Sequence, residues 1–229
     1  MRLALFLALL GGAAAAQDLP DLPPDTEPYE VAVFRSIYEI EAPAFTIPMH
    51  LVNESAYPAY YGAAPALFAG AAVAGEDLNP AVRLGVAQVT TVGITVLLKR
   101  VINRPRPYVA LDGVEARDER HMGDDIFDPY SFPSGHTSSS FAIATSLSLS
   151  YPEWYVIAPS AVWASAMGVT RIWHGVHYPT DVLVGALIGT ASGVAVHLLM
   201  PDVLGDDGDP EVEAARAAAS APVRFVVPL

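Results

Sequence analysis

Cysteine is absent from this sequence of 229 residues, and charged residues are few. Without cysteine the chain forms no disulfide, no thiolate zinc site and no lipidated N-terminal cysteine. Charged residues make up 16% of the sequence, compared with about 25% in an average chain. Hydrophobic residues make up 52%, and the mean hydropathy is +0.36. This composition favours a helical membrane bundle.

Positive charge is the scarcer sign, with 12 Lys and Arg against 25 Asp and Glu and a formal net charge of −13. This balance argues against nucleic acid as a partner, because phosphate backbones bind basic surfaces. The acids concentrate in Asp18–Glu30, Glu115–Asp128 and Asp202–Glu213. We interpret all three clusters as solvated loops or tails.

Residues 1–16 have the pattern of a secretory signal peptide, with an apolar run at Leu3–Leu10 and small alanines before Gln17. The alternative is a first transmembrane helix that stays attached, although the run is short for that. Residues 17–54 are expected to form an acidic, proline-rich linker followed by short amphipathic helices.

Five long apolar segments between residues 55 and 200 predict an all-α bundle of five to six long helices that crosses a membrane. The segments are Pro58–Gly75, Ala81–Leu98, Ser138–Leu149, Tyr155–Val169 and Val182–Met200. The last holds nineteen residues without Asp, Glu, Lys or Arg. A soluble helical bundle with a very apolar core is the alternative, and residues 201–229 are expected to be an acidic, alanine-rich tail.

Because successive helices of a bundle run in alternate directions, every second connection lies at the same end. The short connections Glu76–Pro80 and Ser150–Glu153 lie at one end, so Lys99–Ser131 and Arg171–Thr180 lie at the other. If the N-terminus is exported, this second end faces the periplasm or the exterior.

The first motif consists of two cations, Lys99 and Arg106. Lys99 is followed seven residues later by Arg106, in a stretch that its prolines stiffen. Arg106 can hold a phosphate bidentately, and Lys99 adds a point charge. The alternative is a set of helix C-terminal cations that complement the dipole, and we assign Arg104 to that role.

Pro133-Ser134-Gly135-His136 leads into an apolar helical stretch. Ser134 is a natural N-cap, Gly135 permits close backbone approach, and such a helix start attracts anions. His136 can exchange a proton near neutral pH. An ordinary capped helix with a surface histidine would give the same pattern.

A third motif comprises Arg171, His177 and Asp181. Asp181, near a helix start, can accept the imidazole N–H of His177 and raise its nucleophilicity. The alternative is a carboxylate that serves only the helix dipole. His174 and His177 stand three apart, but no third metal ligand is arranged near them. The other histidines are interpreted as a loop residue that can touch substrate (His121) and as structural residues (His50 and His197).

Together these fragments resemble the type 2 phosphatidic acid phosphatase family, which shares its site with vanadium haloperoxidases. The match covers roughly residues 55–200, and it resembles bacterial membrane members. One departure is Thr170, where the family usually has serine before the arginine; the hydroxyl is retained.

The resemblance implies a two-step hydrolysis of a phosphate ester without a metal or other cofactor. It implies that His177 attacks phosphorus to form a phosphohistidine, that Asp181 orients it, and that His136 protonates the leaving alkoxide and then activates water. The phosphoryl oxygens would be held by Lys99, Arg106, Ser134, Gly135 and Arg171.

The expected function is hydrolysis of a lipid phosphate or pyrophosphate by an exported membrane protein whose site faces outward. The expected partners are that substrate and the bilayer, and the oligomeric state is left open. Three other functions fit the sequence less well: a soluble exported acid phosphatase, a vanadate-dependent haloperoxidase and a non-enzymatic membrane scaffold.

Overall fold

The computed structural model describes residues 28–117 and 130–200. The signal-peptide, tail and His121 interpretations lie outside these ranges. Within them all regular secondary structure is helical, which confirms the predicted fold class. The helices are α2 (Tyr29–Tyr38), α3 (Pro43–Glu54), α4 (Ala56–Ala74), α5 (Asn79–Ile102), α6 (Pro107–Ala110), α7 (Gly135–Ser150), α8 (Trp154–Trp173) and α9 (Pro179–Leu199).

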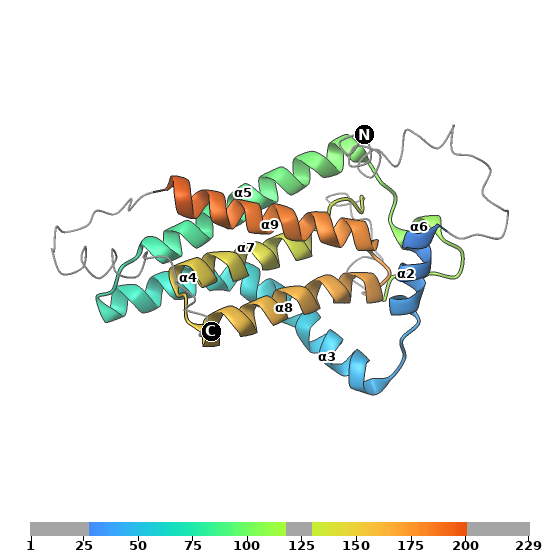
Figure 1. Cartoon of the computed structure of the whole chain (residues 1–229), viewed down its shortest axis with the longest axis horizontal. Coiled ribbons are helices and arrows are strands. Elements are labelled where there is room, and N and C mark those ends of the chain that lie inside the picture. The colour runs from blue at the N-terminus through green and yellow to red at the C-terminus, as the bar shows by residue number, and fades with distance from the viewer. Residues whose placement is uncertain (1–27, 118–129, 201–229) are drawn as a thin grey trace, which may run out of the picture.

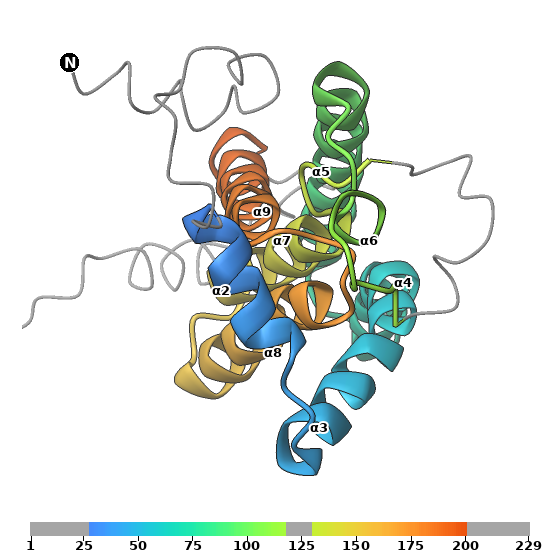
Figure 2. The same cartoon turned by 90° about the vertical axis from the view of Figure 1, so that its right-hand side faces the viewer.

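The five long helices α4, α5, α7, α8 and α9 run lengthwise through the molecule (Figure 1). Seen from the end, α7 occupies the centre, with the other four around it (Figure 2). Its buried face is small and polar, and includes Ser138, Ser140 and Ser146. The neighbouring helices therefore shield the least apolar of the five predicted segments.

Glycines bring α9 unusually close to α7. A Cβ atom placed on Gly189 would lie 2.1 Å from the carbonyl oxygen of Ser138, and one on Gly185 would lie 2.7 Å from that of Ser134. Both distances are far below van der Waals contact, so only glycine allows this approach. Small residues at helix interfaces permit such packing in membrane bundles.

The outer surface of the bundle is apolar. Val89 of α5, Val162 of α8 and Leu187 of α9 are 75%, 69% and 63% exposed. Two segments, Asn79–Ala110 and Pro179–Leu199, are long and apolar enough to cross a membrane. The bundle thus carries polar residues at its centre and apolar residues outside.

All three sequence motifs lie at one end of the bundle, which we call the motif end. It is formed by the C-terminal ends of α5 and α8 and the N-terminal ends of α7 and α9. The short amphipathic helix α2 crosses this end and packs on α8 and α9 (Figure 2). At Asn103 the backbone takes a left-handed conformation, with φ 52°, which ends α5 and turns the chain across the motif end.

Candidate active site

Three buried cations gather at the motif end. Lys99, Arg106 and Arg171 are 6%, 0% and 0% exposed. Each donates to an oxygen of the protein: Lys99 Nζ to the carbonyl of Tyr130 (2.5 Å), Arg106 Nη1 to that of Val176 (3.1 Å), and Arg171 Nε to Thr170 Oγ1 (3.0 Å). Positive charges concentrated in a site of low dielectric attract an anion strongly. The threonine that replaces the usual serine keeps its hydroxyl bonded to Arg171.

The start of α7 faces the same region. Ser134 caps the helix, because its Oγ accepts hydrogen bonds from the Thr137 backbone N–H (3.4 Å) and from Thr137 Oγ1 (2.9 Å). The Ser134 N–H donates to the carbonyl of Asp181 at 3.0 Å, which ties α7 to α9. A Cβ on Gly135 would have only Thr95 Cγ2, at 3.7 Å, within 4 Å. The free space beside Gly135 suits an anion at the helix N-terminus.

His136, on the first turn of α7, lies against two tyrosines of α4. The rings of Tyr57 and Tyr60 each meet its imidazole edge-on, with centroids 5.6 Å apart. The Tyr60 hydroxyl also donates to the His136 carbonyl at 2.9 Å. The two aromatic contacts position the imidazole, and the hydrogen bond ties the first turn of α7 to α4. Neither tyrosine belongs to the three sequence motifs.

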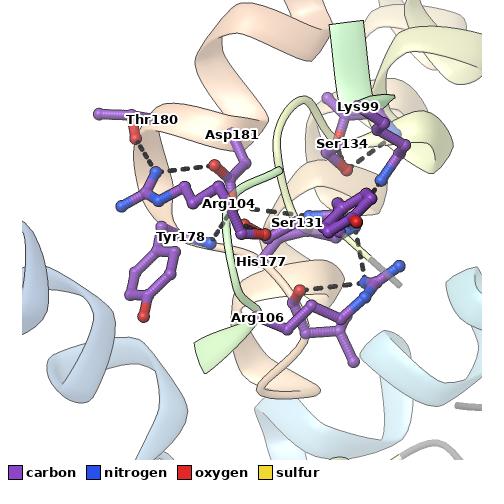
Figure 3. Close-up of polar contacts among 12 residues, drawn as sticks. Lys99, Arg104, Arg106, Ser131, Ser134, His177, Tyr178, Thr180 and Asp181 are labelled. Atoms are coloured by element: carbon purple, nitrogen blue, oxygen red, sulfur yellow. Dashed lines mark hydrogen bonds and ion pairs between the residues drawn. The ribbon is translucent and has the colours of Figure 1, made fainter. Parts of the chain in front are cut away.

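His177 is buried between the cations and Asp181 (Figure 3). Its Nε2 lies 3.3 Å from Arg106 Nη1, and its Nδ1 lies 3.6 Å from Asp181 Oδ2, which is slightly longer than a hydrogen bond. Burial lowers the pKa of His177 well below its ordinary value of 6.5, and the nearby charges of Arg106, Lys99, Arg171 and His136 lower it further. The lowered pKa favours the neutral imidazole, the form in which a ring nitrogen can act as a nucleophile.

This neutral ring predicts an unusual pH dependence of hydrolysis. A neutral imidazole is available only above its pKa, so a lowered pKa extends activity downward and the acid limb of kcat/KM should lie below pH 6.5. The substrate phosphate also titrates, near pH 6. Profiles should therefore be measured with two aryl phosphates of different phosphate pKa. A limb at or above pH 6.5 that is the same for both substrates would contradict a neutral His177.

Asp181 is held by groups on both of its oxygens. Oδ2 accepts from the Tyr178 N–H at 2.8 Å, and Oδ1 accepts from Arg104 Nη1 at 2.8 Å (Figure 3). The assignment of Arg104 to the helix dipole was therefore wrong, because its guanidinium forms a hydrogen-bonded ion pair with this carboxylate. Arg104 and Arg106 therefore have different partners, the carboxylate of Asp181 and the carbonyl of Val176.

Arg171 also bonds a residue that the sequence did not indicate. Its Nη2 donates to Oδ1 of Asn53, a buried residue of α3. These residues are 118 positions apart, and a lone asparagine in an amphipathic helix carries no recognisable motif. α3 therefore reaches the cation cluster although it lies outside the three motifs.

Three further histidines lie within the described residues: His50, His174 and His197. His174 is buried, with Nδ1 2.6 Å from the carbonyl of Thr170 and its ring packed edge-on against those of Trp173 and His50. His197 is in the last turn of α9, at the far end of the bundle. Within residues 28–117 and 130–200, no three His, Asp or Glu side chains form a group able to hold a metal ion.

A cavity of about 770 Å³ opens between α4, α5 and α7. One part of its wall is polar and includes Lys99, Gly135 and His136. Another part is apolar and includes Val89 and Val92 of α5, which face the exterior of the bundle. The cavity thus joins the apolar surface to the polar start of α7.

Comparison with known proteins gives the family. The model of the PAP2 superfamily matches residues 80–204. The bacitracin transport permease protein BcrC of Bacillus licheniformis is 35% identical over 100 residues, covering 42% of this chain and 43% of that protein. The lipid A 1-phosphatase of Rhizobium johnstonii is 36% identical over 94 residues, covering 41% and 36%. The matches thus span less than half the length of these curated relatives.

Two solved structures share the fold. The LpxE structure from Aquifex aeolicus has a TM-score of 0.60 at 27% identity, covering 76% of this chain and 98% of that one. The transmembrane PAP2 type phosphatidylglycerolphosphate phosphatase from Bacillus subtilis has a TM-score of 0.64 at 22% identity, covering 86% and 94%. The family model, which matches more than half of the chain, agrees with the motifs and the helical fold: this chain belongs to the PAP2 superfamily.

Proposed function

We propose that this protein is a membrane phosphatase that hydrolyses a lipid phosphate through a phosphohistidine. The observation that carries the proposal is the cavity, which connects an apolar outer surface to Lys99, Gly135 and His136. A lipid has this same division, with an apolar chain joined to an anionic headgroup. Relatives named as lipid A phosphatases and as a decaprenylphosphoryl-5-phosphoribose phosphatase support this substrate class.

The geometry supports separate roles for the two histidines. His136 is on the cavity wall, whereas His177 is buried with its Nε2 beside Arg106. Phosphoryl transfer requires the attacking and leaving atoms to lie roughly in line on opposite sides of phosphorus. A lipid in the cavity places its leaving oxygen on the side of His136. His136 then protonates that alkoxide, while His177 attacks through Nε2 from the buried side.

The two steps balance with the residues present. In the first, the His177 Nε2–phosphorus bond forms, the ester P–O bond breaks, and the alkoxide takes a proton from His136. In the second, His136 removes a proton from water, which attacks phosphorus and releases phosphate from His177. Lys99, Arg106 and Arg171 stabilise the charge on the phosphoryl oxygens throughout. These three cations supply the electrostatic role that a metal ion takes in other phosphatases.

The apolar exterior and the two apolar segments support a position in the bilayer, with the motif end level with the lipid headgroups. We further propose that the motif end faces outward, following export of the N-terminus. The valine-lined wall of the cavity also favours a lipid over the small soluble phosphomonoesters of the alternative acid phosphatase.

Val92→Trp tests the proposed binding of the lipid chain. The indole should occupy the apolar part of the cavity and raise KM for long-chain phosphatidate about tenfold, which corresponds to about 1.4 kcal/mol of lost binding. KM for 4-nitrophenyl phosphate should not change. Both activities are measured in mixed micelles containing EDTA, where hydrolysis by the wild type should persist.

Val162→Trp is the matched control, because Val162 is exposed on α8 and lies outside the cavity wall. An equal effect of Val92→Trp on both substrates would contradict the proposed lipid path. Loss of wild-type hydrolysis in EDTA would contradict the metal-independent mechanism.

A further inference from the structure

Glu30, on the first turn of α2, reaches the active site from outside the region that the family model matches. Its carboxylate accepts from Arg104 Nη2 at 2.7 Å and from the Thr180 backbone N–H at 3.1 Å, and it also accepts from Thr180 Oγ1. The Glu30 side chain is 26% exposed. The interpretation of Asp18–Glu30 as a solvated cluster is therefore wrong for its last member.

Arg104 is the link between Glu30 and Asp181. Its guanidinium donates to Glu30 on one side and to Asp181 Oδ1 on the other, and Nη1 also donates to Thr180 Oγ1 at 2.8 Å. The guanidinium carbon lies 3.9 Å from the centroid of the Tyr178 ring. This planar group is thus fixed by stacking and by two carboxylates, as arginine geometry permits.

The charges of this trio bear on His177. An isolated Arg104–Asp181 pair would be neutral, and Arg104 would offset the attraction of Asp181 for the positive charge that develops on His177. With Glu30 added, two carboxylates share one guanidinium and the trio carries a net charge of −1. Burial raises the pKa of Glu30, but its hydrogen bonds and the charge of Arg104 outweigh this and lower the pKa overall. Glu30 is therefore ionised at neutral pH.

We propose that Glu30 is a positioning residue for the phosphatase reaction, acting through Arg104 to hold the Asp181 carboxylate in place beside His177. The first turn of α2 then helps to position the active site. This inference rests on the proposed function.

Glu30→Gln tests the proposal, because it removes the charge with little change in size. We expect kcat to fall about 10- to 100-fold, the range that misplacement of a catalytic group produces, with KM unchanged. Glu30→Asp keeps the charge and should recover most of kcat. Glu39→Gln is the matched control, since Glu39 is exposed at the other end of α2. Thermal unfolding in detergent identifies any variant that fails to fold.

A double-mutant cycle separates positioning from simple attachment of α2. In an Arg104→Gln background, Glu30→Gln should lower kcat less than twofold further, because the link is already broken. Equal losses in both backgrounds, or a loss of kcat by Glu30→Gln no larger than that by Glu39→Gln, would overturn the proposal while leaving the proposed function intact. A wild type that hydrolyses no phosphate ester would overturn both.

Discussion

His177→Ala is expected to lower kcat for lipid phosphate by at least about 10⁴-fold, since we propose His177 as the nucleophile and removal of a nucleophile costs enzymes losses of this order or more. The loss follows from the position of the ring, whose Nε2 lies beside Arg106 and whose Nδ1 faces Asp181. Binding should be affected much less, because the three buried cations remain. The measurement is single-turnover hydrolysis together with acid-labile incorporation of labelled phosphate into the protein.

His197→Ala is the matched control, with the same substitution at the opposite end of α9. It should retain both hydrolysis and labelling. Labelling that survives in His177→Ala would assign the nucleophile to another residue. A wild type that hydrolyses the substrate at full rate without ever becoming labelled would favour direct attack by water.

Gly189→Ala is expected to have the largest effect on folding. The new Cβ would lie 2.1 Å from the Ser138 carbonyl oxygen, 2.8 Å from the Ala142 nitrogen and 2.9 Å from the Phe141 Cβ. Two of these atoms are backbone, so relief requires α7 and α9 to separate. Overpacking of a core costs about 1–3 kcal/mol, and we expect a value at or above the upper end of this range. The measurement is the midpoint of thermal unfolding in detergent.

Gly93→Ala is the control for this substitution, because a Cβ on Gly93 would meet no atom within 4 Å. Alanine is the better helix former by up to about 1 kcal/mol, so this variant should be unchanged or more stable. Gly189→Ala should also reduce kcat in the fraction that stays folded, since separating the helices strains the hydrogen bond from the Ser134 N–H to the Asp181 carbonyl. Equal midpoints for the two variants would contradict the close packing of α7 on α9.

Much of the fold was predictable because long apolar segments can be recognised locally in the sequence. The end of the bundle at which each connection lies then follows from the alternating direction of successive helices. The five long helices occur where they were expected. The helices extend beyond the apolar runs that predicted them: α7 begins at Gly135, ahead of the run at Ser138, because Ser134 is its cap, as the motif predicted. Likewise α5 continues past Leu98 to Ile102 and ends at the left-handed Asn103.

The site was predictable only as far as its motifs extend. The structure brings Lys99, Arg106 and His177 together at the motif end, as spacing and parity predicted. Other site residues are held by partners from the N-terminal helices: Asn53 of α3 bonds Arg171, Tyr60 of α4 bonds His136, and Glu30 of α2 bonds Arg104. Each pair is more than 70 positions apart in sequence. No short pattern encodes such contacts, because they depend on how the N-terminal helices pack against the bundle.

The central position of α7 has a consequence for how the protein is assembled in a membrane. α7 has 16 residues, or about 24 Å of helix, which is shorter than the roughly 30 Å hydrocarbon layer. Its serines and threonines would also be poorly solvated by lipid on their own. α7 thus depends on α5, which is synthesised before it, and on α9, which is synthesised after it. We therefore expect a chain truncated before α9 to leave part of the polar surface of α7 facing lipid.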